Sequence, residues 1–154
     1  MTARVALATC AEWPELWLDD HPLVAALRAR GVAGVPCIWD DPDVDWAGFP
    51  LVAVRSTWDY TTQRAAFLAW AERVAAVTTL ANPLPVLRWN SHKGYLRDLA
   101  AAGVPVVPTV WASEVIDLAA VLDERGWSRA VVKPAVSAGG RDTVIVDRRD
   151  TAAR

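Results

Sequence analysis

Two lysines are the residues of this chain best suited to neutralising negative charge at one point. Of its 16 basic side chains only two are lysines, Lys93 and Lys133, and the others are arginines. Lys133 ends an apolar run and is soon followed by a loop of small residues that includes Ser137, Gly139 and Gly140. An ammonium group is a compact point charge, and successive amides of such a loop can point at phosphate oxygens. The pattern predicts a polyphosphate site, and the alternative is a solvated lysine beside an ordinary turn.

The first half of the chain predicts the elements of a parallel sheet. Apolar runs of β type indicate strands at Arg4–Thr9, Val35–Trp39 and Leu51–Val54. A first helix is expected to begin at Asp20-His21-Pro22 and to end before Gly31, and the apolar spacing predicts a longer helix at Gln63–Val77. The order β-α-β-β-α is typical of a doubly wound, Rossmann-like layer. No GxGxxG motif follows the first strand and no P-loop motif occurs, so the sequence does not support a conventional dinucleotide site or a P-loop.

The second half predicts a different, smaller α+β arrangement. Helices are expected at Lys93–Ala102, capped by Asn90 or Ser91, and after Ser113 as its cap, with an extended piece at Val104–Thr109 between them. The runs Ala130–Lys133 and Thr143–Val146 predict a β-hairpin around the small-residue loop. The change in organisation predicts two domains, residues 1–88 and 89–154.

Composition limits the class of protein. The chain is 53% hydrophobic and 22% charged, which is typical of a globular protein with ample core-forming side chains. No apolar run approaches the ~20 residues of a membrane span, and the N-terminus lacks the features of a signal peptide. A net charge of −2 with scattered basic residues argues against nucleic acid or a membrane as partner. Cys10 and Cys37 are expected to be buried and reduced, as in a cytoplasmic protein.

The sequence does not favour a catalytic histidine or a metal site among the other polar residues. His92 opens a predicted helix, where a histidine is more often a surface residue than a catalyst. Four aspartates form the acidic segment Asp40, Asp41, Asp43 and Asp45. Nothing in the sequence fixes their geometry for a metal, so a solvated turn is the expected reading and no metal ligand is assigned.

The order of these motifs resembles the ATP-grasp superfamily, in the variety of glutathione-synthetase-like and RimK-like carboxylate–amine ligases. The residues that carry the resemblance are WNSHK ending at Lys93, VVKP around Lys133 before SAGG, VRSTWDY from Val54 to Tyr60, and GVPVVPT from Gly103 to Thr109. The resemblance extends over essentially the whole chain. It implies a Rossmann-like domain before an ATP-grasp domain, of which this chain carries the first, small subdomain.

The resemblance also implies a site and a chemistry. Lys93 and Lys133 would contact the phosphates of ATP, and Ser137, Gly139 and Gly140 would lie on the loop that closes over them. The acceptor-substrate site would be bordered by Arg55, Ser56, Thr57, Trp58, Asp59 and Tyr60. For Arg55 the alternative is a surface ion pair with Asp59. The implied reaction joins a small-molecule carboxylate to an amine or thiol through an acyl phosphate, with ATP and Mg²⁺.

The chain departs from the family pattern after Val146, where only eight residues follow. The second ATP-grasp subdomain is therefore expected to be absent, together with the Mg²⁺ ligands that it carries. We expect this form to be inactive alone, as a truncated product, a fragment or a divergent stand-alone remnant of a ligase. Its uncovered apolar edge favours a homodimer. The alternative function is a non-catalytic module, derived from an ATP-grasp protein, that binds a small ligand or a partner.

Overall fold

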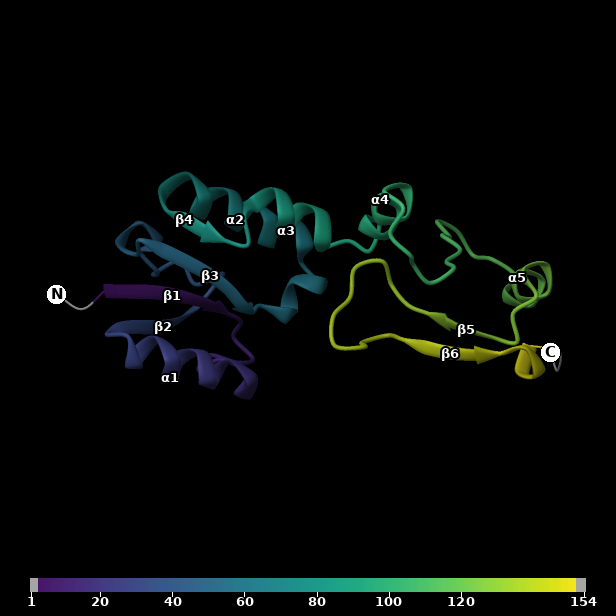
Figure 1. Ribbon diagram of the computed structural model, residues 1–154, viewed down its shortest axis with the longest axis horizontal. Coiled ribbons are helices and arrows are strands. Elements are labelled where there is room, and N and C mark those ends of the chain that lie inside the picture. The colour runs from purple at the N-terminus through teal and green to yellow at the C-terminus, as the bar shows by residue number, and fades with distance from the viewer. Residues whose placement is uncertain (1–2, 152–154) are drawn as a thin grey trace. The chain divides into compact units, whose positions relative to one another are not determined.

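The computed structural model describes the backbone of residues 3–151 and the side chains of residues 3–149 (Figure 1). The chain divides into two compact units, Met1–Ser91 and His92–Arg154. The sequence placed a boundary after residue 88, and the structural division lies after Ser91.

The first unit is built on a four-stranded parallel sheet in the order β2-β1-β3-β4. Its strands are β1 (Ala3–Thr9), β2 (Val32–Ile38), β3 (Leu51–Ser56) and β4 (Thr79–Ala81). The predicted parallel α/β sheet is confirmed. The sequence did not predict β4, because three residues are too short to establish a strand pattern.

Helices cover both faces of this sheet (Figure 1). They are α1 (His21–Ala29), α2 (Arg64–Val77) and α3 (Leu84–Asn90). Gly34 of β2 allows α1 to approach closely, since a Cβ there would lie 3.0 Å from Leu7 Cδ1 and 3.1 Å from Leu27 Cδ1. Because side chains alternate along a strand, the residues on either side of Leu7 face the other way, toward α2.

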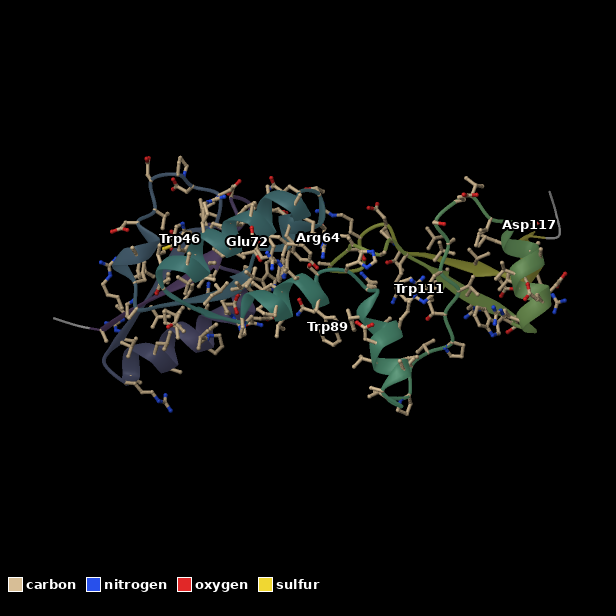
Figure 2. All side chains as sticks on the ribbon, turned by 90° about the horizontal axis from the view of Figure 1, so that it is seen from above. Trp46, Arg64, Glu72, Trp89, Trp111 and Asp117 are labelled. Carbon is tan, nitrogen blue, oxygen red and sulfur yellow. The ribbon has the colours of Figure 1, made fainter. Side chains whose placement is uncertain are left out.

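The core of the first unit lies between the sheet and α2. Strand residues of small volume, Ala6, Ala8 and Val52, are fully buried there and leave room for large aromatic rings. Trp70 of α2 is 1% exposed, and Trp46, labelled in Figure 2, packs edge-on against it with ring centroids 5.3 Å apart. Aromatic packing of this kind stabilises the unit beyond the area that it buries.

Helix α3 corrects an expectation from the sequence. The segment Asn82-Pro83-Leu84-Pro85 was expected to break regular structure, yet a helix begins at Leu84. Pro83 is its N-cap and Pro85 lies in its first turn, where proline is tolerated because the amide has no partner within the helix. Asn90, a predicted cap of the next helix, is instead the last residue of this one.

As far as residue 151, the second unit contains three helices and a hairpin. They are α4 (Tyr95–Ala101), α5 (Leu118–Arg125), β5 (Arg129–Val132), β6 (Val144–Asp147) and α6 (Arg148–Thr151). Strands β5 and β6 pair antiparallel, with Val131 opposite Ile145. The predicted hairpin is therefore confirmed, and Lys133 follows its first strand directly.

Several predicted boundaries in the second unit are wrong. The N-cap of α4 is Gly94 rather than Asn90 or Ser91. The piece at Val104–Thr109 pairs with no strand, since its prolines remove amide donors. Helix α5 begins after Asp117 (labelled in Figure 2), whose carboxylate accepts from the amides of Ala119 and Ala120, and not after Ser113.

Two further expectations concern the cysteines and membrane segments. Cys10 and Cys37 are both buried and free, as the sequence predicted. Burial raises the pKa of the Cys37 thiol.

Within the described part of the chain, no helix has the length and apolarity that crossing a bilayer requires.

Candidate functional site

The structure brings Lys93 to the small-residue loop that follows β5. The Lys93 backbone amide donates to the Ala135 carbonyl at 2.7 Å. Its Nζ donates to the Ser137 carbonyl at 2.9 Å and to Ser137 Oγ at 2.5 Å. Residues 44 positions apart are thus joined at one point of the second unit, and the side chain of Lys93 is held toward the loop.

The surroundings of Lys93 disfavour its charged form. Burial, and secondly the positive charge of Lys133, lower the pKa of Lys93 below its usual 10.5. The two lysines of the chain are therefore close enough for their charges to interact, although 40 positions separate them in sequence. An anion that contacts both ammonium groups would relieve this repulsion.

The backbone of the loop is suited to an approach by a ligand. Gly139 and Gly140 adopt φ of +60° and +74°, the left-handed region that strongly favours glycine. Apart from the glycine itself and its two chain neighbours, no described atom lies within 4 Å of the position of a Cβ on either glycine. The conformation, and not a lack of space, therefore accounts for the two glycines, and the space above them is open.

A second group of polar residues lies at the carboxyl ends of β1 and β3. These strands are neighbours in the order β2-β1-β3-β4, and the chain leaves them toward opposite edges of the sheet. Ligands of open α/β sheets bind at such a switch point. Arg55 and Ser56 are the last residues of β3 and lie at this position.

The pairing of β1 with β3 is irregular at Arg55. Ala8 pairs with Val54 and Thr9 with Ser56, so that Arg55 has no partner residue in β1. An extra residue of this kind re-aims a side chain and is frequent beside functional sites. The irregularity places Arg55 and Ser56 so that both contact one carboxylate, that of Asp20.

Asp20 is the residue that the sequence did not single out. Its Oδ1 accepts from Arg55 Nε at 2.7 Å and also from Arg55 Nη2, and its Oδ2 accepts from Ser56 Oγ at 2.6 Å. Ser56 Oγ in turn accepts from the amide of Trp17 at 3.1 Å. The expected alternative, an ion pair of Arg55 with Asp59, is wrong, because Asp20 takes that place. An acidic residue before a helix was visible in sequence, but its partner 35 positions away was not.

The other predicted substrate residues have different environments. Thr57 is buried, Trp58 is 41% exposed, and Trp58 packs against Trp17 with ring centroids 5.4 Å apart. Asp59 accepts from Trp39 Nε1 at 2.9 Å and from Gln63 at 3.2 Å. Tyr60 packs on Phe67 of the core at 5.4 Å between ring centroids. Asp59 and Tyr60 therefore have structural partners, whereas Arg55 and Trp58 are partly open to solvent.

Among the described residues, His92 and the aspartates of the acidic segment from Asp40 to Asp45 have local hydrogen-bond partners only. His92 is exposed and its Nδ1 accepts from the Gly94 amide at 2.9 Å, as a residue that opens a helical turn does. Asp41 accepts from the Asp43 amide within its own turn at 2.9 Å. In residues 3–149, no three His, Cys, Asp or Glu side chains come together to hold a metal ion.

Comparison with known proteins decides the family. The sequence profile described as "D-cycloserine synthetase DcsG, N-terminal domain" matches residues 5–82, which is half of the chain. The chain belongs to the DcsG N-terminal domain family. The "Cycloserine biosynthesis protein DcsG" of Streptomyces lavendulae is 45% identical over 120 residues, covering 77% of this chain and 40% of that protein.

Two solved structures extend the family relationship beyond residue 82. The crystal structure of D-cycloserine synthetase DcsG matches with a TM-score of 0.85 and 40% identity, over 97% of this chain and 52% of that one. A RimK domain ATP-grasp protein of Sphaerobacter thermophilus matches with a TM-score of 0.70 and 25% identity, over 97% of this chain and 56% of that one. The DcsG-family chain is thus the N-terminal portion of an ATP-grasp fold, and it spans about half the length of these relatives.

Proposed function

We propose that this chain supplies the acceptor-substrate side and part of the ATP-phosphate site of an ATP-dependent carboxylate–amine or carboxylate–thiol ligase. The observation that carries the proposal is the convergence of the two lysines on one loop. Lys93 is held at Ser137 by two hydrogen bonds, and its pKa is lowered partly by Lys133. The similarity to ATP-grasp proteins supports reading the two lysines as part of a site for the phosphates of ATP.

The residues present fit the phosphates of ATP. Lys93 and Lys133 would supply positive charge, which phosphoryl transfer requires. The loop residues Ser137, Gly139 and Gly140 would bring a hydroxyl group and exposed backbone to the same phosphates. When bound, ATP would supply the phosphoryl group that activates the substrate carboxylate.

Mg²⁺ is usually bound through one or two carboxylates together with substrate phosphates. Within the described side chains, no group of three His, Cys, Asp or Glu residues comes together. The proposal assigns no Mg²⁺ ligand to this chain. The substrate side is assigned to Arg55–Tyr60 at the switch point of the sheet.

A chimera tests the proposed function directly. The matching N-terminal part of Streptomyces lavendulae DcsG is replaced by this chain, and ADP release is measured with the substrate of DcsG. We expect ADP release by the chimera and a loss on the order of 10-fold to 100-fold in the Lys93→Ala and Lys133→Ala variants, since each removes a charged hydrogen-bond donor.

Arg125→Ala is the matched control, because Arg125 is an exposed cation of the second unit at the end of α5. This variant should release ADP at the rate of the unmodified chimera. Equal rates in all four proteins would contradict the assignment of the two lysines. Calorimetry with Mg·ATP on the same set separates loss of binding from loss of turnover, and ATP binding without turnover would favour a non-catalytic module.

A further inference from the structure

The buried carboxylate of Asp20 holds Arg55 from one side only. The side chain of Asp20 is 8% exposed, whereas that of Arg55 is 41% exposed. Asp20 uses both oxygens, Oδ1 for two nitrogens of Arg55 and Oδ2 for the Ser56 hydroxyl group. The remaining N–H groups of Arg55 have no partner among the described residues. The guanidinium group is therefore fixed along one edge and open along another.

A role in stability alone does not explain the ion pair between Asp20 and Arg55. Burying a carboxylate and pairing it with arginine gives little net stability, because the cost of desolvation offsets the attraction. The link between β3 and the segment before α1 is also made by neutral groups, since Ser56 Oγ accepts from the Trp17 amide. An arginine that served only to neutralise Asp20 would need no exposed edge and no irregularity in the pairing of its strand.

The position of the open edge points to a small ligand. Arg55 lies at the carboxyl end of β3, beside β1, at the switch point of the sheet. Trp17 and Trp58, which pack against each other, belong to the segments that Ser56 joins. A guanidinium fork recognises a carboxylate through two parallel hydrogen bonds, and aromatic rings provide an apolar wall beside it.

We propose that Asp20 is a positioning residue that orients Arg55 so that its open edge binds the carboxylate of a small-molecule substrate, next to Trp17 and Trp58. This inference rests on the proposed function for the identity of the ligand as a carboxylate. It adds a residue outside Arg55–Tyr60 and a definite role for Arg55. Carboxylate binding at Arg55 does not require ATP, so the two proposals can fail separately.

The test compares a carboxylate with its amide on the whole chain. Tryptophan fluorescence follows titrations with D-serine and with D-serinamide, which lacks the negative charge. We expect D-serine to bind more tightly than the amide by at least about tenfold, because only the carboxylate can accept two hydrogen bonds from the fork. Asp20→Asn should reduce this ratio to near one, since the neutral side chain holds the guanidinium less firmly.

Asp19→Asn is the matched control, because Asp19 is the exposed neighbour of Asp20 and should leave the ratio unchanged. The ratio is the decisive readout, since a general loosening of the fold would weaken both ligands alike. Equal binding of the two ligands by the unmodified chain, no saturable binding of D-serine, or an unchanged ratio in Asp20→Asn would overturn the inference.

A second measurement needs no substitution and covers the case in which Asp20→Asn does not fold. Phenylglyoxal modifies accessible arginines, and mass spectrometry reports the modification of each one. D-serine should protect Arg55 and leave Arg125 as reactive as before, while D-serinamide should protect neither. Unprotected Arg55 would overturn the inference. Mg·ATP binding measured on the same sample distinguishes this failure from failure of the proposed function.

Discussion

Lys93 is the residue whose surroundings bear most directly on the proposed phosphate site. Its ammonium group is held by two oxygens of Ser137 while another positive charge, that of Lys133, lies near enough to lower its pKa. A site built to receive an anion is expected to show this combination, because the ligand supplies the missing negative charge. The same combination makes the residue sensitive to pH.

The titration of Lys93 should be visible in the stability of the protein. Its folded pKa is lowered, so between that value and 10.5 the unfolded chain binds more protons than the folded chain. The free energy of unfolding should therefore rise with pH across this window relative to Lys93→Gln, which has no such group. Below the folded pKa the cost of the charged form is fully present.

Chemical unfolding at a series of pH values measures this difference. The raised pKa of Cys37 acts in the opposite direction but is common to both proteins, so it cancels in the comparison. Parallel pH profiles for the two proteins would show that Lys93 titrates normally in the folded chain.

Arg55 shows that the ion-pair partner of a residue cannot be predicted from its sequence neighbours alone. The sequence offered Asp59 as its partner, four positions away, because local spacing is the only geometry that a sequence gives. The structure instead pairs it with Asp20 through a register shift between β1 and β3. The shift depends on the pairing of two strands and leaves no mark in the residue types themselves.

At the scale of elements, sustained apolar periodicity predicted the bounds of a helix well, whereas the identity of a capping residue did not. Helix α2 lies within one residue of the predicted Gln63–Val77, because its apolar spacing is sustained over four turns. The start of α5 was placed at Ser113, since serine is a favoured cap. Asp117 also carries a side-chain oxygen that can accept from backbone amides, and it is the cap in the structure. Val115, which lies between Ser113 and Asp117, is fully exposed.

The cap of α5 gives a prediction at this scale. Asp117 accepts from the Ala119 amide at 2.9 Å and from the Ala120 amide at 3.1 Å. Asp117→Ala should lower the free energy of opening of α5 by about 1 kcal/mol, because these amides lose their acceptor. Hydrogen exchange of the amides of α5 measures the opening.

Ser113→Ala is the control for this prediction, because Ser113 was the alternative cap and lies outside the helix. It should leave the exchange of α5 unchanged. A larger effect of Ser113→Ala than of Asp117→Ala would show that the helix begins earlier in solution.

At the scale of the whole molecule, buried apolar residues are concentrated in the first unit. The buried core cluster lies entirely between Ala6 and Leu87. In the second unit, Leu122 is the one buried hydrophobic residue among those described. Apolar side chains of its hairpin are largely exposed instead, and they are Val131, Val132, Val144 and Ile145.

This distribution predicts unequal stability of the two units. Hydrophobic burial is the main source of folding free energy, so the second unit should open far more often than the first. Native-state hydrogen exchange should show protected amides in β1 and β3 and much faster exchange in β5 and β6. The sheet of the first unit is the internal control, and equal protection in both sheets would contradict the prediction.

The sequence by itself determined the class of fold, the hairpin and the residues that carry charge. These follow from local physics, since apolar periodicity, glycine-rich turns and the rarity of lysine are properties of neighbouring residues. It also indicated the ATP-grasp superfamily, through motifs whose order along the chain is distinctive, whereas the DcsG N-terminal domain family came from comparison with known proteins.

Only the tertiary structure decided which of these residues meet. Lys93 reaches Ser137 and Arg55 reaches Asp20 because the sheet and the hairpin bring distant segments together. Contacts between residues 35 to 44 positions apart depend on strand order, register and helix ends. No local pattern specifies these quantities, because they arise from the packing of the elements as a whole.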